Sequence, residues 1–207
     1  MKFLKKLMVV LLTVIMIMPL TAYAAPASPS KTSLKNATAT AKSVVYNGEK
    51  QTAKITVTLD GKTLEYGKDF IVDGSRKRKN AGTYSLKIKG IGKYTGTKTV
   101  KFTVKKADRN VQLTFSGKPF RNGAKNYRVS TLKTKTRSFK INVIKKGSVG
   151  VTFTSSSKAL SVTNDGKVTV KIGTKAGVYN VYVKIKETKN YNAFKQVVKV
   201  RVYEDRK

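Results

Sequence analysis

Two stretches of sequence decide the fold class of this 207-residue chain: Gly82-Thr83-Tyr84-Ser85-Leu86-Lys87-Ile88 and Gly177-Val178-Tyr179-Asn180-Val181-Tyr182-Val183. Each begins with Gly-x-Tyr and then places an apolar residue at every second position. Alternation with a period of two is typical of a β-strand that buries one face and exposes the other. Both stretches are therefore predicted to be strands.

These stretches belong to a longer repeat, since Tyr84 and Tyr179 lie 95 residues apart. In both copies a loop with a second tyrosine follows (Tyr94 or Tyr191), and then a closing strand over residues 99–104 or 197–202. The alternation recurs elsewhere, separated by Asn-Gly and Asp-Gly turns, and no stretch shows the helical period. We predict an all-β fold of two tandem immunoglobulin-like antiparallel β-sandwich domains.

The repeat and the N-terminal pattern divide the chain. Three Lys precede an apolar run over residues 7–20 and an Ala-Tyr-Ala site that ends at Ala24. That run is shorter than the about 20 residues of a membrane-spanning helix, so we predict a cleaved signal peptide and no transmembrane span afterwards. The expected segments are signal peptide 1–24, flexible leader 25–32, sandwich 33–104, linker 105–110 and sandwich 111–207.

The composition excludes several kinds of chemistry. The chain has 44 Lys+Arg, 10 Asp+Glu, no Cys and no His, for a formal net charge of +34. Without Cys or His there is no disulfide, no thiol nucleophile, no His base and no usual zinc ligand set. Glu65 and Asp69 are near neighbours that leave a glycosidase carboxylate pair conceivable. We nevertheless predict no enzyme, no cofactor and no metal, because the other carboxylates are scattered or lie in turns.

The Gly-x-Tyr pattern has a structural interpretation. In immunoglobulin-type sandwiches, a tyrosine near the start of strand F returns its hydroxyl to the backbone upstream. Tyr84 and Tyr179 are the candidates for this tyrosine corner, with the small Gly82 and Gly177 leaving room for the crossing. The alternative is that both tyrosines are ordinary strand aromatics on the core face.

The first unit resembles an immunoglobulin-like repeat that is common in surface proteins of Gram-positive, clostridia-like bacteria. The matching residues are Tyr46, Gly48, Val57, Leu64, Gly67, Asp69, Phe70, Val72, Asn80, Gly82, Ile88, Gly90, Gly92, Tyr94, Gly96 and Thr97. The second unit resembles a companion Lys-rich module, through stretches such as 127–129, 139–141 and 166–170. The resemblance implies an accessory or adhesive domain pair outside the cell. In some Gram-positive sandwiches an Asn forms an isopeptide bond with Lys; Asn80 or Asn190 has the residue type, but no spacing selects either.

Two basic clusters are the candidate polyanion-binding residues. One is Arg76, Lys77, Arg78 and Lys79, which replaces the usual polar turn of the family, and the other is Lys145 and Lys146. The alternative for any single lysine is a solvated surface position that keeps sheet edges from pairing. Signal removal leaves a net charge of +31, and repulsion among so many cations would be relieved by a polyanion.

These observations predict a non-enzymatic, secreted or cell-wall-associated binding or adhesion module. The expected partners are anionic polymers, namely wall teichoic acid, capsule, glycosaminoglycan or extracellular DNA, and no intracellular nucleic acid. Two alternatives stay open. One is a carbohydrate-binding accessory pair in which Tyr94 or Tyr191 stacks on a glycan; glycans and a host surface protein are the other candidate partners. The other is a structural spacer with no ligand.

Overall fold

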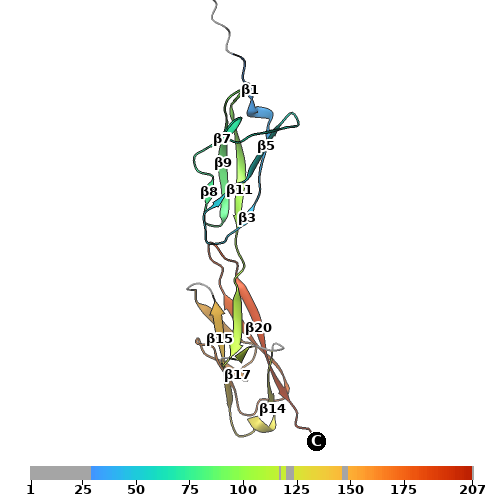
Figure 1. Ribbon diagram of the computed structural model, residues 1–207. Coiled ribbons are helices and arrows are strands. Elements are labelled where there is room, and N and C mark those ends of the chain that lie inside the picture. The colour runs from blue at the N-terminus through green and yellow to red at the C-terminus, as the bar shows by residue number, and fades with distance from the viewer. Residues whose placement is uncertain (1–28, 117, 120–123, 146–148, 207) are drawn as a thin grey trace, which may run out of the picture.

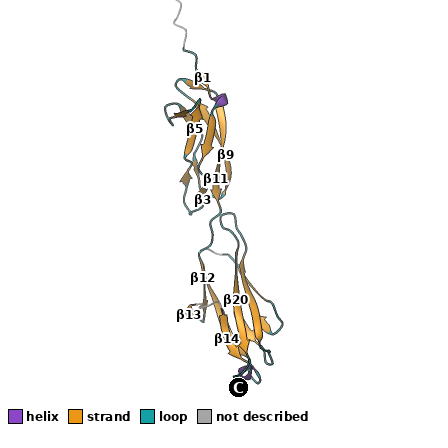
Figure 2. Cartoon of the chain, turned by 90° about the vertical axis from the view of Figure 1, so that its right-hand side faces the viewer, coloured by secondary structure: helices purple, strands orange, loops and turns teal. Residues whose placement is uncertain are grey.

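The computed structural model describes residues 29–116, 118–119, 124–145 and 149–206. The predicted signal peptide and residues 25–28 of the predicted leader lie outside the described residues. The described chain forms two β-domains that follow one another along a single long axis, with β1 and the last described residues at opposite ends (Figure 1 and Figure 2). None of the helices in this part of the chain has the length and apolar character to traverse a lipid bilayer.

The C-terminal domain is a complete two-sheet sandwich. Its elements are β12 (Val111–Phe115), β13 (Lys118–Pro119), β14 (Ala124–Arg128), η2 (Ser130–Leu132), β15 (Arg137–Lys145), β16 (Val151–Ser155), β17 (Leu160–Val162), β18 (Lys167–Val170), β19 (Gly177–Ile185) and β20 (Phe194–Tyr203). One sheet has the order β13-β12-β15-β18-β17 and the other β14-β20-β19-β16. If β12 is called strand A, β14 strand A′, and β15 to β20 strands B to G, the two sheets have the orders A-B-E-D and A′-G-F-C, with the short β13 as an extra edge strand beside A. That is the strand order of an immunoglobulin domain, so the predicted fold class is confirmed.

The N-terminal domain has a reduced version of the same plan. Its elements are β1 (Thr32–Ser33), η1 (Leu34–Asn36), β2 (Thr38–Ala41), β3 (Val44–Val45), β4 (Gln51–Thr52), β5 (Ile55–Leu59), β6 (Lys62–Leu64), β7 (Phe70–Asp73), β8 (Lys77–Arg78), β9 (Gly82–Gly90), β10 (Tyr94–Thr95) and β11 (Thr97–Lys105). The main sheets are β3-β11-β9-β7 and β2-β5-β6, and β6 occupies the place beside β5 that strand E fills in the other domain. Only residues 74–81 connect β7 to β9, which is too short for two further strands.

Strand pairing is antiparallel within most of both domains, as predicted. The exceptions are β3 beside β11, β14 beside β20 and the short pair β1–β10, which run parallel. The first two arise because the first strand of each domain crosses from one sheet to the other, where it joins the last strand in the same direction.

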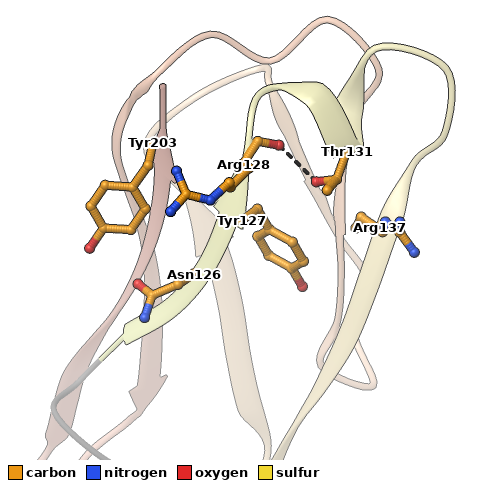
Figure 3. Close-up of a pocket in the computed structure, with 6 residues that line it drawn as sticks. All are labelled: Asn126, Tyr127, Arg128, Thr131, Arg137 and Tyr203. Carbon is orange, nitrogen blue, oxygen red and sulfur yellow. Dashed lines mark hydrogen bonds between the residues drawn. The ribbon is translucent and has the colours of Figure 1, made fainter. Parts of the chain in front are cut away.

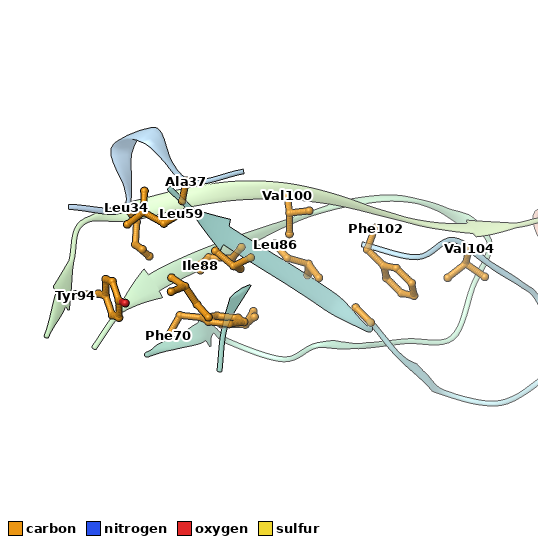
Figure 4. Close-up of a cluster of buried hydrophobic side chains, with 14 residues drawn as sticks. Leu34, Ala37, Leu59, Phe70, Leu86, Ile88, Tyr94, Val100, Phe102 and Val104 are labelled. Carbon is orange, nitrogen blue, oxygen red and sulfur yellow. The ribbon is translucent and has the colours of Figure 1, made fainter. Parts of the chain in front are cut away.

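The alternating residues of the N-terminal domain form its core. Leu86, Ile88, Val100 and Phe102 are at most 4% exposed and lie side by side on the inner face of the sheet that contains β9 and β11 (Figure 4). The lysines that alternate with them on β9 and β11 are mostly exposed. A second cluster of buried residues fills the C-terminal domain, where Val181, Val183 and Val200 are each 0% exposed. The Lys-rich sequence therefore folds because period-two patterning keeps its cations out of both cores.

Both tyrosine hydroxyls bond to the backbone upstream. The Tyr84 hydroxyl donates to the Asn80 carbonyl at 2.8 Å, and the Tyr179 hydroxyl donates to the Lys175 carbonyl at 2.8 Å. In each domain the acceptor lies four residues before the tyrosine. The bond ties the start of the F strand to the loop that leads into it, which is the geometry of a tyrosine corner.

The role expected for Gly82 and Gly177 needs a correction. A Cβ added at either glycine would lie 3.6 Å from the nearest atom of the tyrosine side chain, an ordinary contact, so lack of space is not the reason for glycine. The backbone φ angles are +151° and +156°, which L side chains rarely adopt. Glycine is required at these corners by the backbone conformation.

Asn190 joins the two domains through both ends of its side-chain amide. Its Oδ1 accepts a hydrogen bond from the Ala81 backbone N–H at 2.8 Å, and its Nδ2 donates to Asn80 Oδ1 at 3.1 Å. Its own carbonyl accepts from the N–H of Ala107 in the predicted linker at 3.0 Å. One residue of the loop between β19 and β20 therefore holds the N-terminal domain and the linker together.

Neighbouring side chains extend this junction. The rings of Tyr46 and Tyr191 meet edge to face with centroids 5.4 Å apart, and the Arg109 guanidinium lies 4.9 Å from the Tyr191 centroid. Lys106 in the linker forms an ion pair with Glu187 at 2.9 Å. The linker, predicted as a charged stretch without periodicity, is thus bonded to the loop that follows β19.

Substitution of a corner tyrosine should destabilise its own domain. Tyr84→Phe leaves the Asn80 carbonyl without this donor, at an expected cost of about 1 kcal/mol in the free energy of unfolding. Tyr66→Phe is the matched control, because the Tyr66 hydroxyl has no hydrogen bond among the described residues and its ring is 45% exposed. Urea denaturation measures both variants, and equal losses would contradict the corner's contribution.

Loss of the Asn190 amide should loosen the junction without unfolding either domain. Asn190→Ala removes two interdomain hydrogen bonds, so we expect the domains to reorient independently. Residual dipolar couplings should then require two alignment tensors of different magnitude in the variant and a single one in the wild type. Asn110→Ala, at an exposed linker position, is the control and should behave as the wild type. A single tensor for Asn190→Ala would rule out this role.

Candidate anion-binding sites

In the predicted basic run at residues 76–79, both arginine side chains contact other residues of the domain, whereas both lysine side chains extend into solvent. The Arg76 guanidinium lies 3.8 Å from the Tyr66 ring centroid, a close cation–π contact. Arg78 Nη1 donates to the Ser75 and Lys77 carbonyls at 2.7 Å and 2.8 Å. Lys77 and Lys79 are exposed. The run therefore contributes fewer mobile cations to a ligand than its sequence indicates.

The second predicted cluster is only partly visible. Lys145 ends β15, but its side chain and the whole of Lys146 lie outside the described residues. This pair stays a prediction.

The predicted glycan-stacking tyrosines occupy packed positions. Tyr94 is 8% exposed and belongs to the core of the N-terminal domain (Figure 4). Tyr191 is partly buried in the junction, between Tyr46 and Arg109. Neither ring presents an open face of the kind that stacking on a sugar requires. The loop position of both residues was visible in the sequence, whereas their long-range packing was not.

The carboxylate neighbours of the first domain are also structural. Asp69 is 8% exposed, and its Oδ2 accepts a hydrogen bond from the Glu65 backbone N–H at 2.9 Å. Glu65 itself forms an exposed ion pair with Lys68 at 3.3 Å. Asp69 thus caps the turn that leads into β7, and Glu65 faces solvent.

A pocket that the sequence did not indicate lies at the far end of the C-terminal domain. It has a volume of about 500 Å³ and surrounds the edge strand β14, the turn η2 and the end of β20. Its lining residues are Asn126, Tyr127, Arg128, Thr131, Arg137 and Tyr203. Figure 3 shows Asn126 and Arg128 on the same side of β14 as Tyr203, while Tyr127 points to the other side, toward Arg137.

The pocket is lined by hydrogen-bond donors. Arg128 is held by a bond from its Nη1 to the Glu204 carbonyl at 2.9 Å, and Thr131 Oγ1 donates to the Arg128 carbonyl at 2.7 Å. The Tyr127 hydroxyl is buried without a hydrogen-bond partner in the described part of the chain. No carboxylate is among the described lining residues, so the pocket lacks the acid–base pair of a glycosidase. The two guanidiniums lie on opposite sides of β14, so each side of the pocket offers one cation to an anionic group.

Comparisons with known proteins add little to this geometry. No protein-family model and no curated protein sequence matches the chain. Solved structures with similar folds include the titin Ig tandem domains A164-A165, at 12% identity, TM-score 0.32, and coverage of 79% of this chain and 93% of that chain. The tandem Ig repeats of Dlar are similar at 9% identity and TM-score 0.31, with 82% and 98% covered.

A bacterial surface protein is also similar in fold. BT4661, a SusE-like surface-located polysaccharide-binding protein of Bacteroides thetaiotaomicron, matches at 12% identity and TM-score 0.32, over 79% of this chain and 33% of that chain. Likenesses at these scores carry no inference about function. The immunoglobulin-like assignment rests on the strand order and the two tyrosine hydrogen bonds.

The Tyr127 hydroxyl should titrate late. Burial raises its pKa from 10.0 to about 12, and the smaller effect of Arg137 opposes that rise. Because the folded state holds this proton more tightly than the unfolded state, its contribution to stability is complete below about pH 10 and is lost as pH rises toward 12. The wild type should therefore lose more unfolding free energy than Tyr127→Phe between pH 9 and pH 11.5, measured by urea denaturation. Parallel losses would contradict a buried phenol.

Proposed function

We propose that this protein is a secreted, non-enzymatic binding or adhesion module that associates with anionic polymers at the cell envelope or in the extracellular matrix. The net charge of +31 that remains after removal of residues 1–24 carries the proposal. Among the described residues there are three ion pairs, and at least half of each carboxylate side chain in them is exposed. Solvent-exposed pairs neutralise charge weakly, so most cations remain available to an external polyanion.

The arrangement of the strands supports this function. Lysines on β9, β11, β19 and β20 occupy the alternate positions that face away from the cores. The β14 pocket adds two arginines at the far end of the molecule. Wall teichoic acid, capsule, glycosaminoglycan and extracellular DNA all offer the regularly spaced anionic groups that such a surface would bind.

A spacer role is the second candidate, and the domain junction favours it. Asn190 and the Tyr46–Tyr191 contact hold two domains end to end, which suits a stalk that sets a distance from the cell surface. Binding of neutral glycans at Tyr94 or Tyr191 has less support, because neither ring is open.

A salt-graded binding series separates these functions. We expect the chain without residues 1–24 to bind immobilised heparin and purified wall polymer at about 0.05 M salt and to weaken at least about tenfold by 0.2 M, because binding releases counterions. A neutral polysaccharide column is the control and should not retain it. Retention above about 1 M salt would contradict an electrostatic mechanism. Absence of binding at low salt would leave the spacer as the function.

A further inference from the structure

One sheet face of the C-terminal domain gathers cations around an aromatic ring. The outward positions of β14, β20 and β19 carry five basic residues, and a partly exposed tyrosine lies beside two of the lysines. We call this surface the Tyr182 face, and it consists of Tyr182, Lys184, Lys195, Lys199, Arg201 and Arg128. Among the described residues that point outward from this sheet, none is acidic. We infer that the Tyr182 face binds an anionic polysaccharide, an inference that rests on the proposed function.

The face contains an uncompensated pair of opposed lysines. Lys184 on β19 and Lys195 on β20 are direct cross-strand partners. Directly opposed residues have Cβ atoms about 5 Å apart, and like charges there destabilise a sheet. Both ammonium groups also gather at the same ring, with Nζ atoms 5.8 Å and 5.7 Å from the Tyr182 centroid. An anion bound between them would remove their repulsion.

The other pair of directly opposed lysines in the described strands has a carboxylate beside it that offsets the repulsion. Lys140 on β15 faces Lys167 on β18. Here Asp165 lies beside them, with its Oδ2 3.1 Å from the Lys140 Nζ. A hydrogen bond from Thr163, and after it the Lys140 contact, lower the pKa of Asp165 to about 2, and the carboxylate is charged at neutral pH. The fold supplies a counter-anion at this pair, whereas no carboxylate of the described residues forms an ion pair with Lys184 or Lys195.

The shape and composition of the face favour a polysaccharide over single-stranded nucleic acid. Lys195, Lys199 and Arg201 lie at outward positions of one strand, and successive outward positions are about 7 Å apart. A linear chain with sulfate, phosphate or carboxylate groups on its sugars could follow this line, with one ring packed on Tyr182. Proteins that bind single strands usually stack successive bases on several aromatics. Near the lysine pair this face has a single aromatic side chain, Tyr182. The other outward tyrosine, Tyr203, is distant, because it lies six residues along β20 from Val197, the cross-strand partner of Tyr182.

The equivalent face of the N-terminal domain provides a matched control. Lys87, Lys89 and Lys101 point outward from β9 and β11, as Lys184, Lys195 and Lys199 do from β19 and β20. That face has no opposed lysine pair among the described strands, and Asp73 lies directly opposite Lys87. Removal of three lysines from either face changes the net charge equally. A difference between the two variants therefore reports on the site and not on total charge.

The test compares two triple variants of the chain without residues 1–24. K184S/K195S/K199S should lose about tenfold or more of its affinity for heparin at about 0.15 M salt, with a salt slope lower by about three units. K87S/K89S/K101S should lose less than about threefold. A third variant, Tyr182→Ser, should weaken heparin binding with little change in slope, because it removes a ring and no charge. Thermal unfolding should show K184S/K195S/K199S at least as stable as the wild type, since a like-charge pair is gone.

Each outcome bears on a defined claim. Equal losses in the two triple variants would overturn the Tyr182 face and leave the proposed function standing. No binding of the wild type at low salt would overturn both. Tighter binding of single-stranded oligo-dT than of heparin, lost in the same variant, would overturn the choice of a polysaccharide. A lower melting temperature for K184S/K195S/K199S would contradict the repulsion on which the inference depends.

Discussion

Mutual repulsion among lysine and arginine side chains is the constraint under which this chain folds. With 44 basic and 10 acidic residues, the cations cannot be neutralised within the protein. Within each strand, alternation keeps the cations out of the core. On β11, Val100, Phe102 and Val104 are buried, while Lys101 and Lys105 face solvent. The end-to-end arrangement of the domains spreads the remaining charge along the molecule (Figure 1). In the proposed function, an external polyanion would neutralise the positive charge that remains.

Uncharged contacts therefore hold the parts that charge would push apart. The two corners rest on a tyrosine hydroxyl and a carbonyl, and the junction rests on the Asn190 amide and an edge-to-face pair of tyrosines. These contacts are insensitive to salt, unlike the exposed ion pair between Lys106 and Glu187. The protein can thus be strongly basic and still keep a defined shape at low ionic strength.

The sequence predicts what depends on neighbours in the chain. Alternation around Tyr84 and Tyr179 predicts the strands, the two sandwiches and the corners, because these follow from local period and one loop. The sequence does not predict which side chains contact one another across strands or between domains. The cation–π contact of Arg76 with Tyr66, the junction role of Tyr191 and the β14 pocket all depend on contacts between residues far apart in the sequence or on different strands. The basic run at residues 76–79 was conspicuous for its composition, and half of it proves to be engaged by the fold.

A high count of cations does not by itself locate a binding site, because most of them are solvated and far apart. The informative quantity is charge that the fold brings together and leaves without a counter-ion. Lys140 and Lys167 are brought together, and Asp165 compensates them. Lys184 and Lys195 are brought together with no carboxylate on their face among the described residues. Repulsion that lowers the stability of the free protein is relieved when an anion binds, so a stability defect of this kind is expected at a functional surface.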